Sequence, residues 1–135
     1  MFKVNIDERQ NKVIIKLEED FNLPQAQELL LWIEQMSANL KKGFSVLTDM
    51  STLKKMDINT RKPVEKTMDL LNRRGVSKVV RVIPDNTKDI GFNIMSQFHY
   101  SKEVSIFTCG SLEEAEKFLS NSILLSKEQN NSRKE

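Results

Sequence analysis

Cysteine and histidine each occur only once in these 135 residues, as Cys109 and His99. One cysteine cannot close a disulfide within the chain, and one cysteine with one histidine are too few for a zinc site. A hydrolase would need His99 beside a nucleophile such as Cys109. The helix that carries His99 near its end should run antiparallel to the strand that ends in Cys109. We therefore expect these two residues at opposite edges of the sheet. We therefore expect no metal, no cofactor and no enzyme activity.

Glycine and long apolar runs are also scarce. With four glycines and no Walker loop, GxGxxG, HExxH or CxxC motif, a phosphate cradle or metalloprotease site is not expected. The longest apolar run, Leu29–Ile33, is far shorter than the roughly 20 residues that span a bilayer. The first residues lack the apolar stretch of a signal peptide. These absences predict a cytoplasmic protein without an integral membrane segment.

The composition is that of an ordinary globular domain, with 39% hydrophobic and 30% charged residues. The net charge of +2 is too small to indicate nucleic-acid binding by itself. The length suits one domain, which we place at residues 1–125. Residues 126–135 contain no apolar side chain, so we expect a disordered C-terminal tail there.

A β-hairpin is predicted at the N-terminus. Phe2, Val4 and Ile6 alternate with polar residues, which indicates a strand with one buried face, and residues 13–17 form a second apolar run. The short polar connection makes the pair antiparallel, and Asn11 suits a left-handed turn position.

A first helix should begin at Pro24, where the missing N–H has no partner to lose, and end at Gly43. Its apolar stripe lies at helical spacing: Ala26, Leu29, Leu30, Ile33, Ser37 and Leu40. Lys41 and Lys42 would then occupy the last turn, where cations favour the helix dipole.

The centre of the chain predicts a strand at 44–49, a polar connector at 50–56, a helix at 57–74 and a strand at 78–83. Two buried strands joined by a helix form a parallel, right-handed βαβ unit. Functional residues of such sheets gather at the carboxyl ends of the strands. We therefore assign a binding edge to Asp49, Ser51, Asp57, Asn59 and Thr60.

The remaining elements are a helix at 88–100, a strand at 104–107 and a closing helix that begins with the capping box Ser111-Leu-Glu-Glu114. The order ββαβαβαβα predicts an α/β fold. A hairpin should lie at one edge of a mixed, mostly parallel sheet of about five strands, with four helices distributed over both faces.

Two short segments resemble the STAS domain of anti-sigma factor antagonists: Val46-Leu-Thr-Asp-Met-Ser51 and Met56-Asp-Ile-Asn-Thr60. STAS domains carry an apolar strand ending in Asp, then Asp-Ser-Ser-Gly at a helix start. Asp49 and Asp57 match the two aspartates. The resemblance is to the divergent SpoIIAA-like branch, and it implies a bacterial, non-enzymatic regulatory module that binds a protein partner. For that branch it also implies an alternative, a binder or sensor of a hydrophobic small molecule or lipid.

The serine that is phosphorylated in such antagonists is missing. Ile58 and Asn59 stand in the two serine positions and Thr60 stands where glycine is usual. A kinase-controlled switch of the usual kind is therefore not expected. A phospho-switched antagonist that uses Thr60 or Ser51 is the remaining alternative of this type.

The predicted helix at 88–100 is apolar over a wide arc. Besides an inner stripe it carries Phe92, Met95, His99 and Tyr100. Apolar side chains beyond those that face the core indicate an interface, for example of a homodimer, or a groove for a lipophilic ligand, unless neighbouring helices cover them.

Basic residues gather on the outer face of the predicted helix at 57–74, namely Arg61, Lys62, Lys66 and Arg73. Such a face can dock an acidic partner or anionic lipid headgroups, although a solvated helix surface is the simpler interpretation. No aromatic residue interleaves with the charges, so no nucleic acid is expected.

Asp49 at a strand end also suggests the phosphate acceptor of a receiver domain. Glu18, Glu19 and Asp20 would supply the acidic neighbours, but Cys109 and Gly110 stand where the required lysine belongs. We favour the simpler role in which Asp49 orders its own loop through backbone N–H groups.

Overall fold

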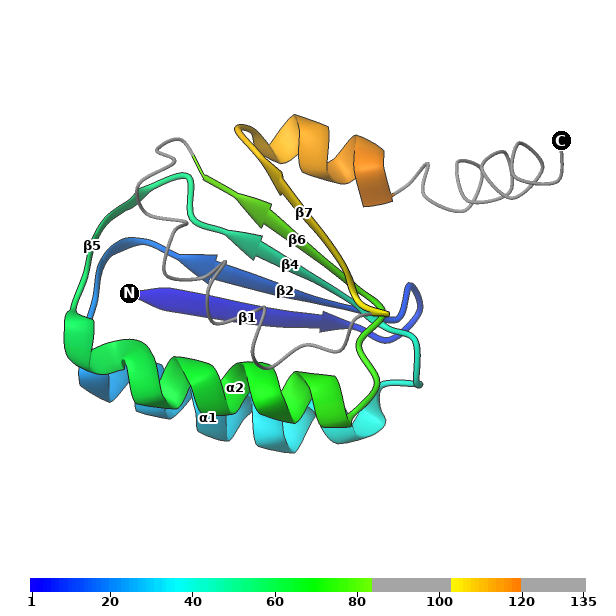
Figure 1. Cartoon of the computed structure of the whole chain (residues 1–135), viewed down its shortest axis with the longest axis horizontal. Helices are drawn as coiled ribbons and strands as arrows, with labels where there is room; N and C mark the ends of the chain where they lie inside the picture. The colour runs from blue at the N-terminus through cyan, green and yellow to red at the C-terminus, as the bar shows by residue number, and fades with distance from the viewer. Residues whose placement is uncertain (84–102, 120–135) are drawn as a thin grey trace, which may run out of the picture.

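Residues 1–83 and 103–119 are described by the structure, a computed structural model (Figure 1). The main sheet has five strands in the order β1-β2-β4-β6-β7. Their bounds are β1 Phe2–Asp7, β2 Lys12–Leu17, β4 Ser45–Asp49, β6 Lys78–Val82 and β7 Ser105–Cys109. β1 and β2 pair antiparallel, and every other pair is parallel. The predicted hairpin at the edge of a mostly parallel five-stranded sheet is therefore confirmed.

A second, two-stranded sheet was not predicted. β3 (Glu19–Phe21) pairs parallel with β5 (Leu53–Met56), in the segment that we interpreted as a polar connector. Two exposed lysines follow the buried Leu53, so β5 lacks the alternation of a half-buried strand. Its partner lies more than thirty residues earlier, and only the folded chain brings the two together.

Two helices cover one face of the main sheet: α1 (Leu23–Met36) and α2 (Arg61–Arg73) (Figure 1). Residues 112–119 are helical and pack on the other face. The described residues thus contain three α-helices, not four, and the predicted helix at 88–100 and the tail at 126–135 lie outside them. None of the described helices has the length and apolarity to cross a bilayer.

The helix boundaries differ from those expected. α1 ends at Met36 and continues only as the 3-10 turn η1 (Ser37–Asn39), so Lys41 and Lys42 lie beyond it. α2 is preceded by the 3-10 turn η2 (Ile58–Thr60), which replaces the first predicted turn. At its start α1 has a capping box that we missed: the Asn22 side chain accepts from Gln25 N, and Asn22 N donates to the Gln25 side chain.

Left-handed turn positions agree with the sequence. Asn11 has a φ of 55°, and its side chain bonds to the main chain of Lys41 in both directions. Gly75, which ends α2, has a φ of 97°, and a Cβ there would meet Lys42. A side chain at Gly75 would therefore be strained both locally and by its neighbour.

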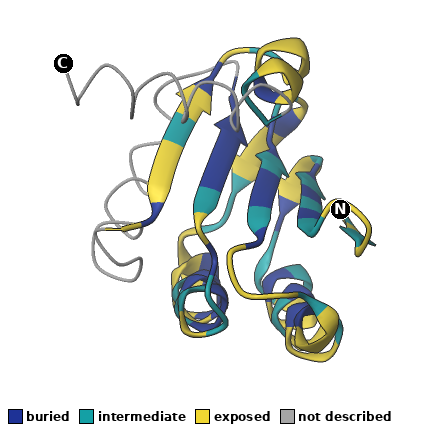
Figure 2. Cartoon of the chain, turned by 90° about the vertical axis from the view of Figure 1, so that its right-hand side faces the viewer, coloured by how far each residue is buried: buried dark blue, intermediate teal, exposed yellow. Residues whose placement is uncertain are grey.

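Apolar side chains form one cluster on each face of the sheet. The larger lies between the sheet and the pair α1 and α2, and it includes Val13, Ile33 and Val79. The smaller lies under residues 112–119, where Leu47 and Val80 pack with Ala115. β4 and β6 are consequently buried on both sides (Figure 2), as is typical of parallel strands.

Candidate functional site

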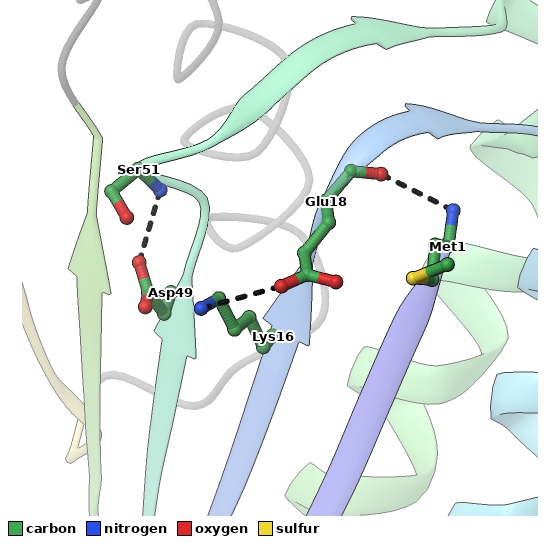
Figure 3. Close-up of polar contacts among 5 residues, drawn as sticks. All are labelled: Met1, Lys16, Glu18, Asp49 and Ser51. Carbon is green, nitrogen blue, oxygen red and sulfur yellow. Dashed lines mark hydrogen bonds and ion pairs between the residues drawn. The ribbon is translucent and has the colours of Figure 1, made fainter.

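Asp49 ends β4 at the carboxyl edge of the sheet. Its side chain is only 5% exposed, and its Oδ1 accepts a hydrogen bond of 3.0 Å from Ser51 N (Figure 3). The next amide, Met50 N, donates to Val82 O at 2.8 Å. Asp49 thus shapes the turn that leads the chain away from β4, as the loop-ordering interpretation predicts.

The residue beside Asp49 on the neighbouring strand is Lys16. Its Nζ lies 3.3 Å from Glu18 Oε1, and the main chain of Glu18 bonds to Met1 (Figure 3). A cation therefore stands beside Asp49, and Glu18, one of the acidic neighbours that a receiver site would use, is paired with that cation. Within residues 1–83 and 103–119, no three His, Cys, Asp or Glu side chains are grouped to hold a metal ion.

The segment from Asp57 to Thr60 forms the turn that opens α2. Thr60 is buried, its Oγ1 donates to Asp57 O at 2.7 Å, and its N–H donates to the same oxygen at 3.1 Å. Asp57 N in turn donates to Phe21 O at 3.1 Å, which ties the turn to β3. A kinase needs an exposed hydroxyl, so this position of Thr60 does not favour it as a phosphate acceptor, whereas Ser51 is half-buried.

Ile58 is the most prominent side chain of this edge, with 92% of its surface exposed. The sequence marks Ile58 only as a missing serine, and the predicted binding edge does not include it. The available signal was an isolated apolar residue between Asp57 and Asn59, off the stripe that α2 buries. The structure therefore keeps Asp49 and Thr60 as buried supports and presents Ile58 and Asn59 to solvent.

The predicted basic face is partly neutralised within α2. Arg61 Nε lies 3.0 Å from Glu65 Oε1, and Arg73 Nε lies 3.2 Å from Asp69 Oδ2. Lys62 and Lys66 are exposed on the same helix. Exposed ion pairs of this spacing contribute only about 0.3–0.5 kcal/mol. A docking role for this face remains a prediction.

The apolar residues Phe92, Met95, His99 and Tyr100 lie outside the described residues, so the predicted interface or ligand groove remains a prediction. Between the main sheet and α2 there is a cavity of about 40 Å³, lined largely by apolar side chains together with Thr48, Thr67 and Arg81. This volume admits a few water molecules at most and is too small for an acyl chain.

Cys109 is buried at the end of β7, and its Sγ donates to Ser111 O at 3.4 Å. Burial raises the pKa of the Cys109 thiol above its ordinary value. The main chain of Ser111 also acts on the thiolate and opposes this rise in pKa, whereas the carboxylates of Glu114 and Asp49 add to the rise. The thiolate, which is the nucleophilic form, is thus disfavoured.

We expect Cys109 to resist alkylation in the folded protein. At pH 8, iodoacetamide should modify it much more slowly than in urea-unfolded protein, because both access and the thiolate fraction are reduced. Mass spectrometry of timed samples measures the two rates, and a free thiol compound in the same urea concentration is the control. Equal rates in the folded and unfolded protein would contradict the burial.

Comparison by sequence finds no relatives: no protein-family model matches the chain, and neither does any curated protein. Comparison by structure finds several similar proteins. A Shewanella loihica protein of the DUF3478 family, described as having a SpoIIAA-like fold, matches with a TM-score of 0.66 at 10% identity, over 87% of this chain and 93% of its own.

Two anti-sigma factor antagonists match in the same way. SpoIIAA in its unphosphorylated form has a TM-score of 0.62 at 16% identity, over 89% of this chain and 98% of its own. An antagonist from Mycobacterium paratuberculosis has a TM-score of 0.56 at 12% identity, over 89% and 95%. The chain has a SpoIIAA-like fold. Its SpoIIAA-like architecture confirms the resemblance drawn from Asp49 and Asp57, while identities this low show the fold alone.

Proposed function

We propose that this protein is a non-enzymatic regulatory module that binds a protein partner through the edge around η2, with Ile58 as the central contact. The observation that carries this proposal is the 92% exposure of Ile58. It stands where the STAS resemblance places a serine. A large apolar side chain at that point is suited to packing against a partner protein. It has no hydroxyl group, so phosphorylation at this position cannot regulate the contact.

The surroundings of Ile58 make it a preorganised contact. Thr60 and Asp57 are held by the main-chain bonds described above, and β5 is paired with β3, so little flexibility is lost on binding. Burial of a whole isoleucine side chain contributes about 1.5–3 kcal/mol. One well-placed apolar anchor of this kind often dominates an interface.

The rim around Ile58 indicates the chemistry of the partner. Lys54, Lys55, Arg61 and Lys62 are exposed on the flanking segments. Lys54, Lys55 and Arg61 pair with Glu19, Asp57 and Glu65 at 3.1, 3.8 and 3.0 Å, so these four cations are opposed by three carboxylates and the margin keeps a small excess of positive charge. An apolar pocket bordered by acidic groups would complement this edge, because such charges steer encounter and fix orientation.

Two structural neighbours are anti-sigma factor antagonists, which supports a partner of the anti-sigma factor type. The missing serine and the buried Thr60 favour an association that phosphorylation does not control. The cavity of about 40 Å³ between the main sheet and α2 is too small to support the alternative of a lipophilic ligand held in the core.

Ile58→Asp should abolish most of this binding and leave the fold intact. A photo-crosslinking residue at position 58, expressed in the source cells, should capture the partner, and the same residue at the exposed Leu31 is the control site. With the purified partner, Ile58→Asp should weaken binding by about 30-fold, equivalent to roughly 2 kcal/mol, at an unchanged melting temperature. Leu31→Asp should bind like the wild type. Equal affinities of wild type and Ile58→Asp would refute the proposed edge.

A further inference from the structure

The outer edge of the sheet is formed by β1, and its hydrogen-bonding groups can be assigned. Met1 and Glu18 exchange both main-chain bonds, at 3.2 and 2.8 Å, so they form a hydrogen-bonded pair. Such pairs alternate along an antiparallel ladder. The N–H and C=O groups of Lys3, Asn5 and Asp7 therefore face β2, and those of Phe2, Val4 and Ile6 face away from it. In the described part of the chain no strand pairs with that side of β1.

A groove with a volume of about 350 Å³ runs along this edge between β1 and α1. Residues 1–4 form one wall, and Gln25, Glu28 and Trp32 form the other. Trp32 is 46% exposed, an unusual position for the only tryptophan of the chain. Unpaired strand edges readily accept another strand, and a neighbouring aromatic side chain adds apolar area to that contact.

We propose that β1 pairs antiparallel with β1 of a second copy, about a two-fold axis at Val4. In this register Phe2 lies opposite Ile6 of the second copy, and Val4 lies opposite its own counterpart. All the outward main-chain groups then meet partners, and the two sheets become one. On the other face, Lys3 lies opposite Asn5 of the second copy, so no like charges oppose each other.

Neighbouring two-fold registers are less favourable. An axis at Lys3 would place the two Lys3 side chains opposite each other, and like charges in that position are destabilising. An axis at Asn5 would place Lys3 opposite Asp7 of the second copy, but it would leave the outward main-chain groups of Phe2 in each copy without a strand partner. The Val4 register thus pairs the most main-chain groups without opposing like charges, and this feature favours a second copy over the strand of an unrelated protein.

Trp32 reinforces this register. Val4 and Trp32 line the same groove, so an axis through Val4 brings the Trp32 side chains of both copies toward each other. Two indole rings would then occupy the grooves that are open in the single chain. Glu28 lines the same groove one helical turn before Trp32, so the two Glu28 carboxylates also approach each other and oppose part of this gain.

Sedimentation of the full chain over a wide concentration range, together with Trp32 emission, tests the proposal directly. We expect a monomer–dimer equilibrium whose dimer fraction rises together with a blue shift of the emission, because Trp32 leaves water on pairing. A wild-type chain that remains monomeric with constant emission up to millimolar concentration would overturn the proposal.

Two variants locate the interface. Val4→Pro removes an outward N–H from each copy without removing a bond to β2, and should raise the dimer dissociation constant by at least about tenfold. Asn5→Ala is the matched control on the same strand, because it keeps every outward group, and should associate like the wild type. Trp32→Glu tests the helix side of the groove without altering the strand, and it should also give a monomer. A dimer that survives both Val4→Pro and Trp32→Glu would place the contact elsewhere and overturn the proposal.

Discussion

Replacing Phe21 by alanine should lower the free energy of unfolding by about 3–5 kcal/mol, the usual cost of removing a buried phenylalanine. Phe21 ends β3, is 0% exposed, and packs edge-on against Phe2 with ring centroids 6.4 Å apart. Its carbonyl accepts from Asp57 N, so the cavity would open directly beneath the proposed binding edge. The change should therefore weaken both the fold and the support of Ile58.

Urea unfolding followed by circular dichroism measures this loss. Leu31→Ala is the control, because Leu31 is a large apolar residue that the fold leaves exposed, and it should change the free energy of unfolding by no more than about 0.5 kcal/mol. A Phe21→Ala protein as stable as the Leu31→Ala protein would mean that β3 is not packed as described.

Val80→Asp should lower the free energy of unfolding by about 3–5 kcal/mol as well, but for an electrostatic reason. Val80 lies in the middle of β6, 0% exposed, and packs against Leu47 and Ala115 on the face covered by residues 112–119. An aspartate there must either bury an unpaired charge or take up a proton. Its destabilising effect should accordingly decrease as the pH falls, because protonation removes the charge.

Thermal melting at pH 7 and at pH 5 tests both parts of this expectation. Ile58→Asp introduces the same charge on the surface, and it should melt within a few degrees of the wild type at both values of pH. A Val80→Asp protein that melts like Ile58→Asp would show that the second face of the sheet is open to solvent.

Local patterns predicted much of this architecture. The alternation of Phe2, Val4 and Ile6 specifies a half-buried strand, and the apolar runs around Val46 and Val80 specify strands that are buried on both faces. Asn11 was correctly expected to take a left-handed turn position, because a positive φ is a property of the residue and its immediate neighbours. Capping by Ser111, whose Oγ accepts from Glu114 N at 3.2 Å, is local in the same sense.

Contacts between distant segments could not be predicted in this way. The pairing of β3 with β5 depends on two short strands that are too irregular to reveal a period. The early end of α1 depends on the packing of the turn after Met36, where Ser37 is buried and donates back to Ile33 O. Neither feature has a signal within one window of sequence.

The same distinction between local patterns and distant contacts applies to the residues of the binding edge. The sequence alone determined that Asp49, Asp57 and Thr60 lie near the carboxyl ends of parallel strands, because strand order and helix position follow from apolar periodicity. Only the tertiary structure decided which of these side chains face solvent. The bonds from Met50 N to Val82 O and from Asp57 N to Phe21 O fix the two turns in which Asp49 and Thr60 are buried and Ile58 is exposed. The position of α1 beside β1 leaves Trp32 exposed at an open edge. Exposure depends on every segment that packs around a residue, so a local pattern such as the place of Ile58 off the α2 stripe can suggest exposure but cannot decide it.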